Sequence, residues 1–322
     1  MAYPFESAAY DIAGPLYTKN EGKIEKNYIL VITCLLYRAV HLELMLRKDT
    51  NEVLNALRKC FARRGRIKKL ISDSDGSFLN TGRHLTELYK EINFKQLRQS
   101  LAMEGTTFEF NVPYSSHRMG IVEAIVKIVK TVLNKKLTRS NLTTWNLITL
   151  VYETECLTNQ RPLCIANVDQ KENIVSPNSL MNLRDGELFP PYKSNKNFKI
   201  PALSTTKDVI IQLKKRDMLR NRLFKTFYDQ YLTKLQEYND KKINTRKIRI
   251  GDSVLIRDDS LSTRNRYPIG TVIDLKLSVT DGRARTLRIR IPASNTTKEK
   301  IVVRDRKMIY LSEITNEDDV TF

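Results

Sequence analysis

The stretch GIVEAIVKIVKTVLNKKL, residues 120–137, has the pattern of an amphipathic helix. Its apolar residues recur at helical spacing, and its single acid, Glu123, begins a polar row on the other side. Lys127, Lys130 and Asn134 follow Glu123 by four, seven and eleven positions, so the four side chains share one face. The row is either a solvated face in which Glu123 pairs with Lys127, or part of a functional surface.

The segments around this helix predict the fold. Three strands should come first, a helix and a strand follow them, and a second helix and a fifth strand precede the quoted helix. We expect them at 6–12, 27–35, 37–44, 49–65, 69–72, 81–101 and 108–112, with one further helix at 144–158. Gly14 and Pro15 should end the first strand, and the three strands should form an antiparallel meander. This order predicts an α/β fold with a mixed sheet, which occurs in RNase H-like folds among others.

Three carboxylates fall at the ends of these predicted strands and helices. Asp11 ends the first strand, Asp73 ends the fourth, and Glu123 begins the helix after the fifth. In an RNase H-like sheet, strands one and four are neighbours and the helix packs across their ends, so the carboxylates should meet. Three carboxylates without a basic partner would repel one another unless a cation lay between them. Their oxygen atoms are hard ligands, which Mg²⁺ and Mn²⁺ prefer.

Two such ions, about 3.5–4 Å apart, clamp the attacking and leaving oxygens of a phosphodiester. Asp11 would bridge the two ions, Asp73 and Glu123 would each complete one site, and Lys127 and Lys130 would bind the nucleic-acid backbone. An ordinary structural interpretation stays open for each acid. Asp11 would then be an ordinary acidic residue at the place where a strand passes into a turn, and Asp73 would cap a turn.

The second half of the chain differs from the first in composition and in its predicted elements. Residues 1–164 are expected to be the catalytic core, 165–205 a proline-containing connector, 206–248 a basic helical segment, 249–315 a small β-barrel and 316–322 an acidic tail. The barrel should have about five strands and an SH3-like size. In its strand TLRIRI, Arg288 and Arg290 alternate with apolar residues, which predicts a basic face that is either a DNA-binding surface or a solvated edge.

Composition narrows the class of partner. Fifty-five Lys and Arg against 36 Asp and Glu give a formal charge of +19, which favours a polyanion. A membrane is not expected, because the longest apolar run, residues 28–37, is too short to span one and no signal peptide pattern precedes it. The four cysteines show no zinc-binding or Cys-x-x-Cys spacing, which favours free thiols in an intracellular protein.

Several segments together resemble a known family. The sequence is similar, nearly end to end, to the integrase region of BEL/Pao-type LTR retrotransposons, within the retroviral-integrase-like superfamily. The segments that carry this resemblance are FESAAYDIAGPL, RAVHLEL, ALRKCFARRGRIKKLISDSDGSF, VPYSSHRMGIVEAIVKIVKTVL, NQRPL, SPNSLMNL and, in the barrel, IRIGDSVLIRDD and YPIGTVIDL.

The resemblance places the family's Asp, Asp, Glu triad on Asp11, Asp73 and Glu123. The chain departs from the family pattern at two places. Ser74 and Asp75 replace the usual Asn-Gly after the second Asp, and Met119 and Val122 replace the Gly and the aromatic residue before the Glu. No zinc-binding domain precedes the core in this sequence.

The resemblance implies an integrase that processes DNA 3′ ends and transfers them into target DNA, using two Mg²⁺ or Mn²⁺ ions. It also implies a homo-oligomer, which would act in the nucleus. The loop before the catalytic helix contains Tyr114, Ser115, Ser116 and His117. It should either contact DNA or be an ordinary helix-capping loop. Two alternatives stay open: an inactive or domesticated DNA-binding protein, and an RNase H-like nuclease.

Overall fold

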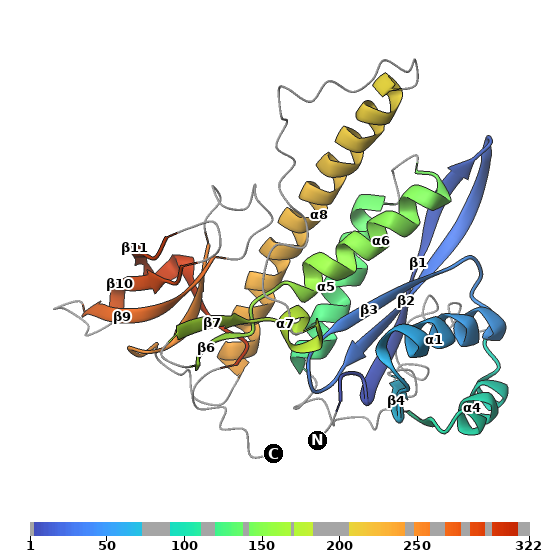
Figure 1. The fold of residues 1–322 in the computed structure, drawn as a ribbon, viewed down its shortest axis with the longest axis horizontal. Helices are drawn as coiled ribbons and strands as arrows, with labels where there is room; N and C mark the ends of the chain where they lie inside the picture. The colour runs from blue at the N-terminus through green and yellow to red at the C-terminus, as the bar shows by residue number, and fades with distance from the viewer. Residues whose placement is uncertain are drawn as a thin grey trace. The chain divides into compact units, whose positions relative to one another are not determined.

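The computed structural model describes residues 3–72, 91–110, 120–137, 142–168, 171–182, 206–241, 248–257, 268–277, 284–293 and 298–314. The chain divides into two compact units, Met1–Asn159 and Gln160–Phe322 (Figure 1). We call them the N-terminal and the C-terminal unit. No described helix combines the length and the apolar character that crossing a bilayer requires.

The N-terminal unit is built on a five-stranded mixed sheet. Its strands are β1 (Ser7–Asn20), β2 (Lys23–Cys34), β3 (Val40–Met45), β4 (Lys69–Ser72) and β5 (Thr107–Phe110), in the order β3-β2-β1-β4-β5. The first three form the expected antiparallel meander, and β4 pairs in parallel with both β1 and β5. This is the predicted RNase H-like core, in which β1 lies at the centre of the sheet.

The first strand does not end at Gly14 and Pro15, so that prediction was wrong. β1 continues to Asn20, and its pairing with β2 shifts register between Ala13 and Leu16. The shift absorbs Pro15, which has no N–H for the ladder. Gly14 has a φ of 127°, and a Cβ there would lie 3.0 Å from the carbonyl oxygen of Asn27. Gly and Pro therefore mark an irregularity within the strand.

The helices of this unit follow the expected order. They are α1 (Thr50–Arg64), α4 (Phe94–Met103), α5 (Gly120–Leu137) and α6 (Thr144–Asn159). Asp49 caps α1 by accepting the N–H of Glu52 at 2.9 Å, and Gly65 follows its last turn at a φ of 88°. The predicted helix at 81–101 corresponds in part to α4, and its residues 81–90 lie outside the described part of the chain.

Helix α6 covers the outer edge of β3. Glu155 accepts the backbone N–H of Leu42 at 2.7 Å. Asn159 accepts the N–H of Val40 and donates to its carbonyl oxygen, both at 2.7 Å. These side chains replace the hydrogen bonds of a neighbouring strand, so this edge is not open to further strand pairing.

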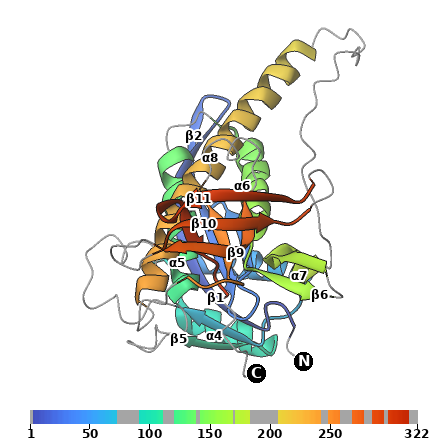
Figure 2. The same cartoon turned by 90° about the vertical axis from the view of Figure 1, so that its left-hand side faces the viewer.

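The C-terminal unit contains a second sheet and a long helix. The sheet, which we call the C-terminal sheet, has the order β11-β10-β9-β8-β12. Its strands are β8 (Ser253–Ile256), β9 (Ile269–Leu277), β10 (Ala284–Ile291), β11 (Lys300–Asp305) and β12 (Ile309–Leu311). Figure 2 shows β9, β10 and β11 side by side. All its pairings are antiparallel. Its core contains Ile248, Val254, Ile256, Val272, Leu287, Ile289, Ile309 and Leu311. A five-stranded sheet is therefore present, while its extent as a separate domain and its closure into an SH3-like barrel stay predictions.

The helix α8 (Thr206–Lys241) has 36 residues, about 54 Å of helix. Two tyrosines fix it to the rest of its unit. Tyr228 donates to the carbonyl oxygen of Ile256 at 2.6 Å, and Tyr231 donates to Glu313 at 2.8 Å. The basic helical segment expected at 206–248 thus forms one helix over most of its length.

The segment expected to be a loop-rich connector begins with regular structure. It contains a hairpin of β6 (Cys164–Val168) and β7 (Lys171–Val175), followed by α7 (Pro177–Asn182). The N–H of Ile165 donates to Ser253 Oγ and the N–H of Ile314 to the carbonyl oxygen of Leu163, both at 3.1 Å. Residues 183–205 lie outside the described part of the chain.

Candidate active site and nucleic-acid interface

Asp11 lies inside β1, as its fifth residue, and not at the end of the strand as expected. It pairs with Val31 of β2. The described pairing of β1 with β4 ends at Tyr10 and Ser72, so Asp11 is the first residue of β1 beyond the segment shared with β4. Asp73 is the next residue in the chain after Ser72.

Helix α5 packs on β1 through its apolar face, on which Ile125, Ile128, Val129, Val132 and Leu133 are buried. From the polar row, Lys130 Nζ forms an ion pair with Asp11 Oδ2. The other oxygen of Asp11 accepts the backbone N–H of Ile12 at 2.7 Å. Both side chains of the ion pair are about one-fifth exposed, at 21% and 22%. Asp11 therefore has a basic partner, so repulsion among the three carboxylates is not the only charge interaction at this site.

The contact fixes the position of the polar row relative to β1. Lys127 is exposed one turn before Lys130. Glu123 lies on α5 seven residues before Lys130, about 10.5 Å along the helix axis. Side chains on a helix lean towards its N-terminus, so we expect the carboxylate of Asp11 on the side of Lys130 that faces the start of α5.

Other predicted site residues lie outside the described residues or carry undescribed side chains. Asp73 and the loop Tyr114, Ser115, Ser116 and His117 are outside, and the side chains of Glu123 and Asn134 are not described. Within the described ranges, no group of three or more His, Cys, Asp or Glu could hold a metal ion. The donor chemistry of the predicted triad fits Mg²⁺, because all three ligands are carboxylates, but a cation at Asp11 Oδ2 must displace Lys130.

Tyr10, next to Asp11, is a buried neutral neighbour of the candidate site. Burial is the main cause that raises the pKa of its phenol, and the negative charge of Asp11 raises this pKa further. The phenol therefore stays protonated at neutral pH and adds no charge beside Asp11.

A network of His, Glu and Arg side chains, with its carboxylates buried, was not predicted from the sequence. His41 Nε2 lies 3.2 Å from Glu43 Oε1, and Arg63 lies 2.8 Å from the same oxygen. His41 Nδ1 lies 3.5 Å from Glu155, which also pairs with Arg64. The network joins β3, α1 and α6 and pairs the buried carboxylates with arginines, so we assign it to the stability of the core.

The C-terminal sheet carries the second predicted DNA-binding surface. Arg288 and Arg290 lie on the face opposite the buried Leu287 and Ile289, and their partners on β11 are Val303 and Ile301. Arg288 Nη1 is 3.9 Å from Asp274 Oδ2, with both side chains nearly half exposed. Since Val303 and Ile301 are also exposed, this face combines guanidinium groups with apolar side chains.

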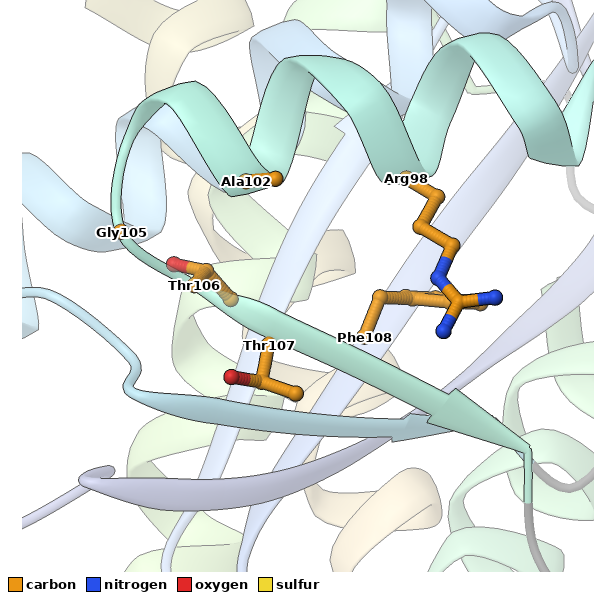
Figure 3. Close-up of a pocket in the computed structure, with 6 residues that line it drawn as sticks. All are labelled: Arg98, Ala102, Gly105, Thr106, Thr107 and Phe108. Carbon is orange, nitrogen blue, oxygen red and sulfur yellow. The ribbon is translucent and has the colours of Figure 1, made fainter.

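One pocket lies on the N-terminal unit away from these residues. It has a volume of about 290 Å³ and lies between α4 and the start of β5, where Arg98 extends towards Phe108 (Figure 3). Its lining residues are Arg98, Ala102, Gly105, Thr106, Thr107 and Phe108. None of these is a predicted site residue.

The chain is similar to one family model over part of its length and to solved structures. Residues 212–304 match a family of unknown function (DUF5641). No curated protein sequence matches the chain. The HTLV-2 integrase catalytic core domain in complex with magnesium is similar at 18% identity in its trimeric form and 15% in its dimeric form. The two matches cover 56% of this chain and 97% or 98% of the HTLV-2 chain, each with a TM-score of 0.34.

A simian T-cell lymphotropic virus intasome, solved in complex with a PP2A regulatory subunit, is similar at 15% identity. That match covers 96% of this chain and 79% of the viral chain, also with a TM-score of 0.34.

Proposed function

We propose that this chain is an integrase that transfers DNA ends into target DNA. The observation that carries the proposal is the ion pair between Asp11 on the central strand of an RNase H-like sheet and Lys130 on α5. This pair puts α5, whose first turn contains Glu123, beside the strand that carries Asp11. Asp73 directly follows Ser72, the partner of Tyr10 in the neighbouring strand.

In this proposal, Asp11, Asp73 and Glu123 hold two Mg²⁺ or Mn²⁺ ions. When bound, such ions lower the pKa of the attacking water or hydroxyl and stabilise the leaving oxygen of the phosphodiester. The residues of the chain orient the DNA. Lys127 is exposed to bind a backbone phosphate, and Lys130 would reach one after leaving Asp11.

Further contacts to DNA complete the proposal. The loop Tyr114 to His117 would contact the DNA end, and Arg288 and Arg290 would bind phosphates through the exposed face of the C-terminal sheet. The formal charge of +19 supports a nucleic-acid partner. From its sequence resemblance, we propose that the chain belongs to the BEL/Pao type, forms a homo-oligomer and acts in the nucleus.

The test is transfer of a labelled element-end duplex into plasmid DNA with Mn²⁺, comparing the unchanged chain with Glu123→Gln. The amide is nearly isosteric with the carboxylate but lacks its charge, so DNA binding should persist. We expect joining by the unchanged chain and none by Glu123→Gln. The contrary result is joining that survives the substitution.

A DNA-binding protein without catalysis is the second candidate. The observation that favours it is the same ion pair, because Lys130 already neutralises Asp11 in place of a cation. In that case neither protein would join or cut DNA, and both would bind it with steep salt dependence. An RNase H-like nuclease, the third candidate, would cut without joining.

A further inference from the structure

Strands β1 and β2 continue as a two-stranded ribbon beyond the rest of their sheet. In the described sheet, β3 pairs with β2 only over residues 28–33, and β4 pairs with β1 only over residues 7–10. Residues 16–20 and 23–27 there pair only with each other, over about 17 Å (Figure 1). We call these two segments the β1–β2 ribbon.

One side of the ribbon is held by the start of α6. Asn20 Oδ1 accepts the backbone N–H of Thr144 at 3.1 Å, and the amide group of Asn20 donates to Glu25. The hydroxyl of Thr144 also donates to Glu25, at 3.3 Å. Glu21 and Gly22, both at positive φ, close the ribbon in a two-residue turn. The ribbon is therefore held in place, and Glu25 is occupied on the side that contacts α6.

The other side of the ribbon carries cations and an apolar residue. Cross-strand partners share a side and successive residues alternate, so the pairs Lys19–Ile24 and Tyr17–Lys26 lie together, opposite the side that contacts α6. We call these four residues the ribbon face. Both lysines are exposed, and Ile24 is 73% exposed. Among the residues that the structure describes, neither lysine forms an ion pair.

We infer that the ribbon face binds the minor groove of double-stranded DNA, with Lys19 and Lys26 on phosphates and Ile24 inserted between base pairs. Two-stranded β-ribbons are one of the structures that enter the grooves of DNA. Proteins that bind the minor groove combine basic side chains with an apolar side chain, such as Ile, that enters between two base steps and kinks the duplex. An exposed isoleucine beside two lysines on a braced ribbon has the same arrangement.

The ribbon face is separate from the candidate active site. Val31 of β2 pairs with Asp11. Ile24 and Lys26 differ from Val31 by odd numbers of positions, so they lie on the opposite side of β2. Lys19 follows Asp11 by eight positions, at most about 27 Å along β1. The ribbon face is thus a second binding surface, and the inference shares with the proposed function only its DNA partner.

Bending of DNA measures the insertion of Ile24. At saturating concentration, the unchanged chain should bring fluorophores at the two ends of a duplex of about 30 base pairs closer together, as a kink of about 20–90° would. Ile24→Thr keeps a β-branched residue, which suits a strand, but replaces the apolar wedge by a polar one. The duplex bound to it should lose most of the bend. Ile174→Thr is the matched control, because Ile174 is 38% exposed in the β6–β7 hairpin.

Salt dependence measures the phosphate contacts. Lys19→Ala and Lys26→Ala should each lower the slope of log affinity for DNA against log salt concentration by about one, because each removes one phosphate contact. Lys23→Ala removes the same charge from the side of the ribbon that contacts α6, and it should leave the slope unchanged. An acidic protein surface could also pair with the lysines, but only DNA gives both the change of slope and the bend.

Three results would overturn the inference. The first is a bound duplex that the unchanged chain leaves straight, and the second is equal bending by Ile24→Thr. The third is a slope that Lys19→Ala and Lys26→Ala change no more than Lys23→Ala does. The test is also independent of catalysis. Bending without joining of DNA would support the ribbon face and contradict the integrase, whereas joining by a chain that does not bend DNA would do the reverse.

Discussion

Lys130 of α5 pairs with Asp11 of β1, and this contact joins the predicted catalytic helix to the central strand of the sheet. An ammonium group at this place has two consequences. It neutralises Asp11 when no cation is bound, and it competes with a cation for the same carboxylate oxygen. If the proposed site binds metal, Lys130 becomes free to contact DNA at the same time.

The first prediction concerns metal affinity. Lys130→Ala should bind Mn²⁺ more tightly than the unchanged chain in the absence of DNA, because the competing ammonium is gone. The ion pair is partly exposed, so we expect an effect of about threefold to tenfold, corresponding to roughly 1 kcal/mol. Electron paramagnetic resonance of free Mn²⁺ measures this affinity. An unchanged or weaker affinity contradicts the displacement of Lys130 by metal.

Lys127→Ala is the control for this substitution. Lys127 lies on the same row but is exposed one turn away, so its loss should leave the affinity for Mn²⁺ unchanged. Both substitutions should reduce the slope of log affinity for DNA against log salt concentration by about one. A slope that neither substitution changes would show that the row does not bind phosphates.

The second prediction concerns the C-terminal sheet. The double substitution Arg288→Ala and Arg290→Ala should weaken DNA binding similarly for all sequences and lower the salt slope by up to about two. Fluorescence anisotropy at several salt concentrations gives both quantities. Lys68→Ala is a suitable control, because Lys68 is an exposed cation of the N-terminal unit that pairs with Glu6. If the double substitution and Lys68→Ala lowered the affinity for DNA equally, the effect would come from the net charge of the chain and not from this face of the sheet.

Much of the fold could be predicted because its elements have strong local signals. The apolar periodicity of α5 and the caps of α1 at Asp49 and Gly65 are local properties of the sequence. The continuation of β1 through Gly14 and Pro15 could not be read in this way. It depends on β2, whose Asn27 lies opposite the irregularity.

The candidate site was predictable in part for the same reason. The position of Glu123 and Lys130 on one helix face follows from their spacing, but the partner of Lys130 is Asp11, which lies 119 residues earlier. The alternation of His41 and Glu43 along β3 predicted a strand correctly. It could not reveal that their polar face is buried, because Glu155 and the arginines that pair with it come from distant helices.

The third prediction concerns Cys60, which is buried on α1. Burial is the main cause that raises the pKa of its thiol to about 12. In the unfolded chain the thiol titrates near its ordinary value of about 8.5. The folded state therefore holds the proton more tightly. This contribution to stability is complete below about pH 8.5 and is lost as the pH rises towards 12.

Urea unfolding at several pH values measures this contribution. Between pH 9 and 11 the free energy of unfolding should fall by up to about 1.4 kcal/mol per pH unit more in the unchanged chain than in Cys60→Ala. At pH 8 a thiol reagent should modify the partly exposed Cys156 and Cys164 before Cys60. Parallel pH profiles of the two proteins would contradict the assignment to Cys60.

The last prediction concerns the buried pair of Arg161 and Glu313, which links the start of the C-terminal unit to its end. Arg161 Nε lies 2.8 Å from Glu313 Oε1, both side chains are fully buried, and Tyr231 donates to the same oxygen. Arg161→Met should lower the free energy of unfolding by about 3–5 kcal/mol, because it leaves a buried carboxylate without its cation.

Two further variants are the controls. Arg161→Met combined with Glu313→Leu should recover most of this loss. Lys234→Met, which breaks the exposed pair with Glu237, should lower the free energy of unfolding by under about 1 kcal/mol. Thermal and urea unfolding followed by circular dichroism gives the three values. A loss in Arg161→Met no larger than in Lys234→Met would show that the buried pair does not stabilise this unit.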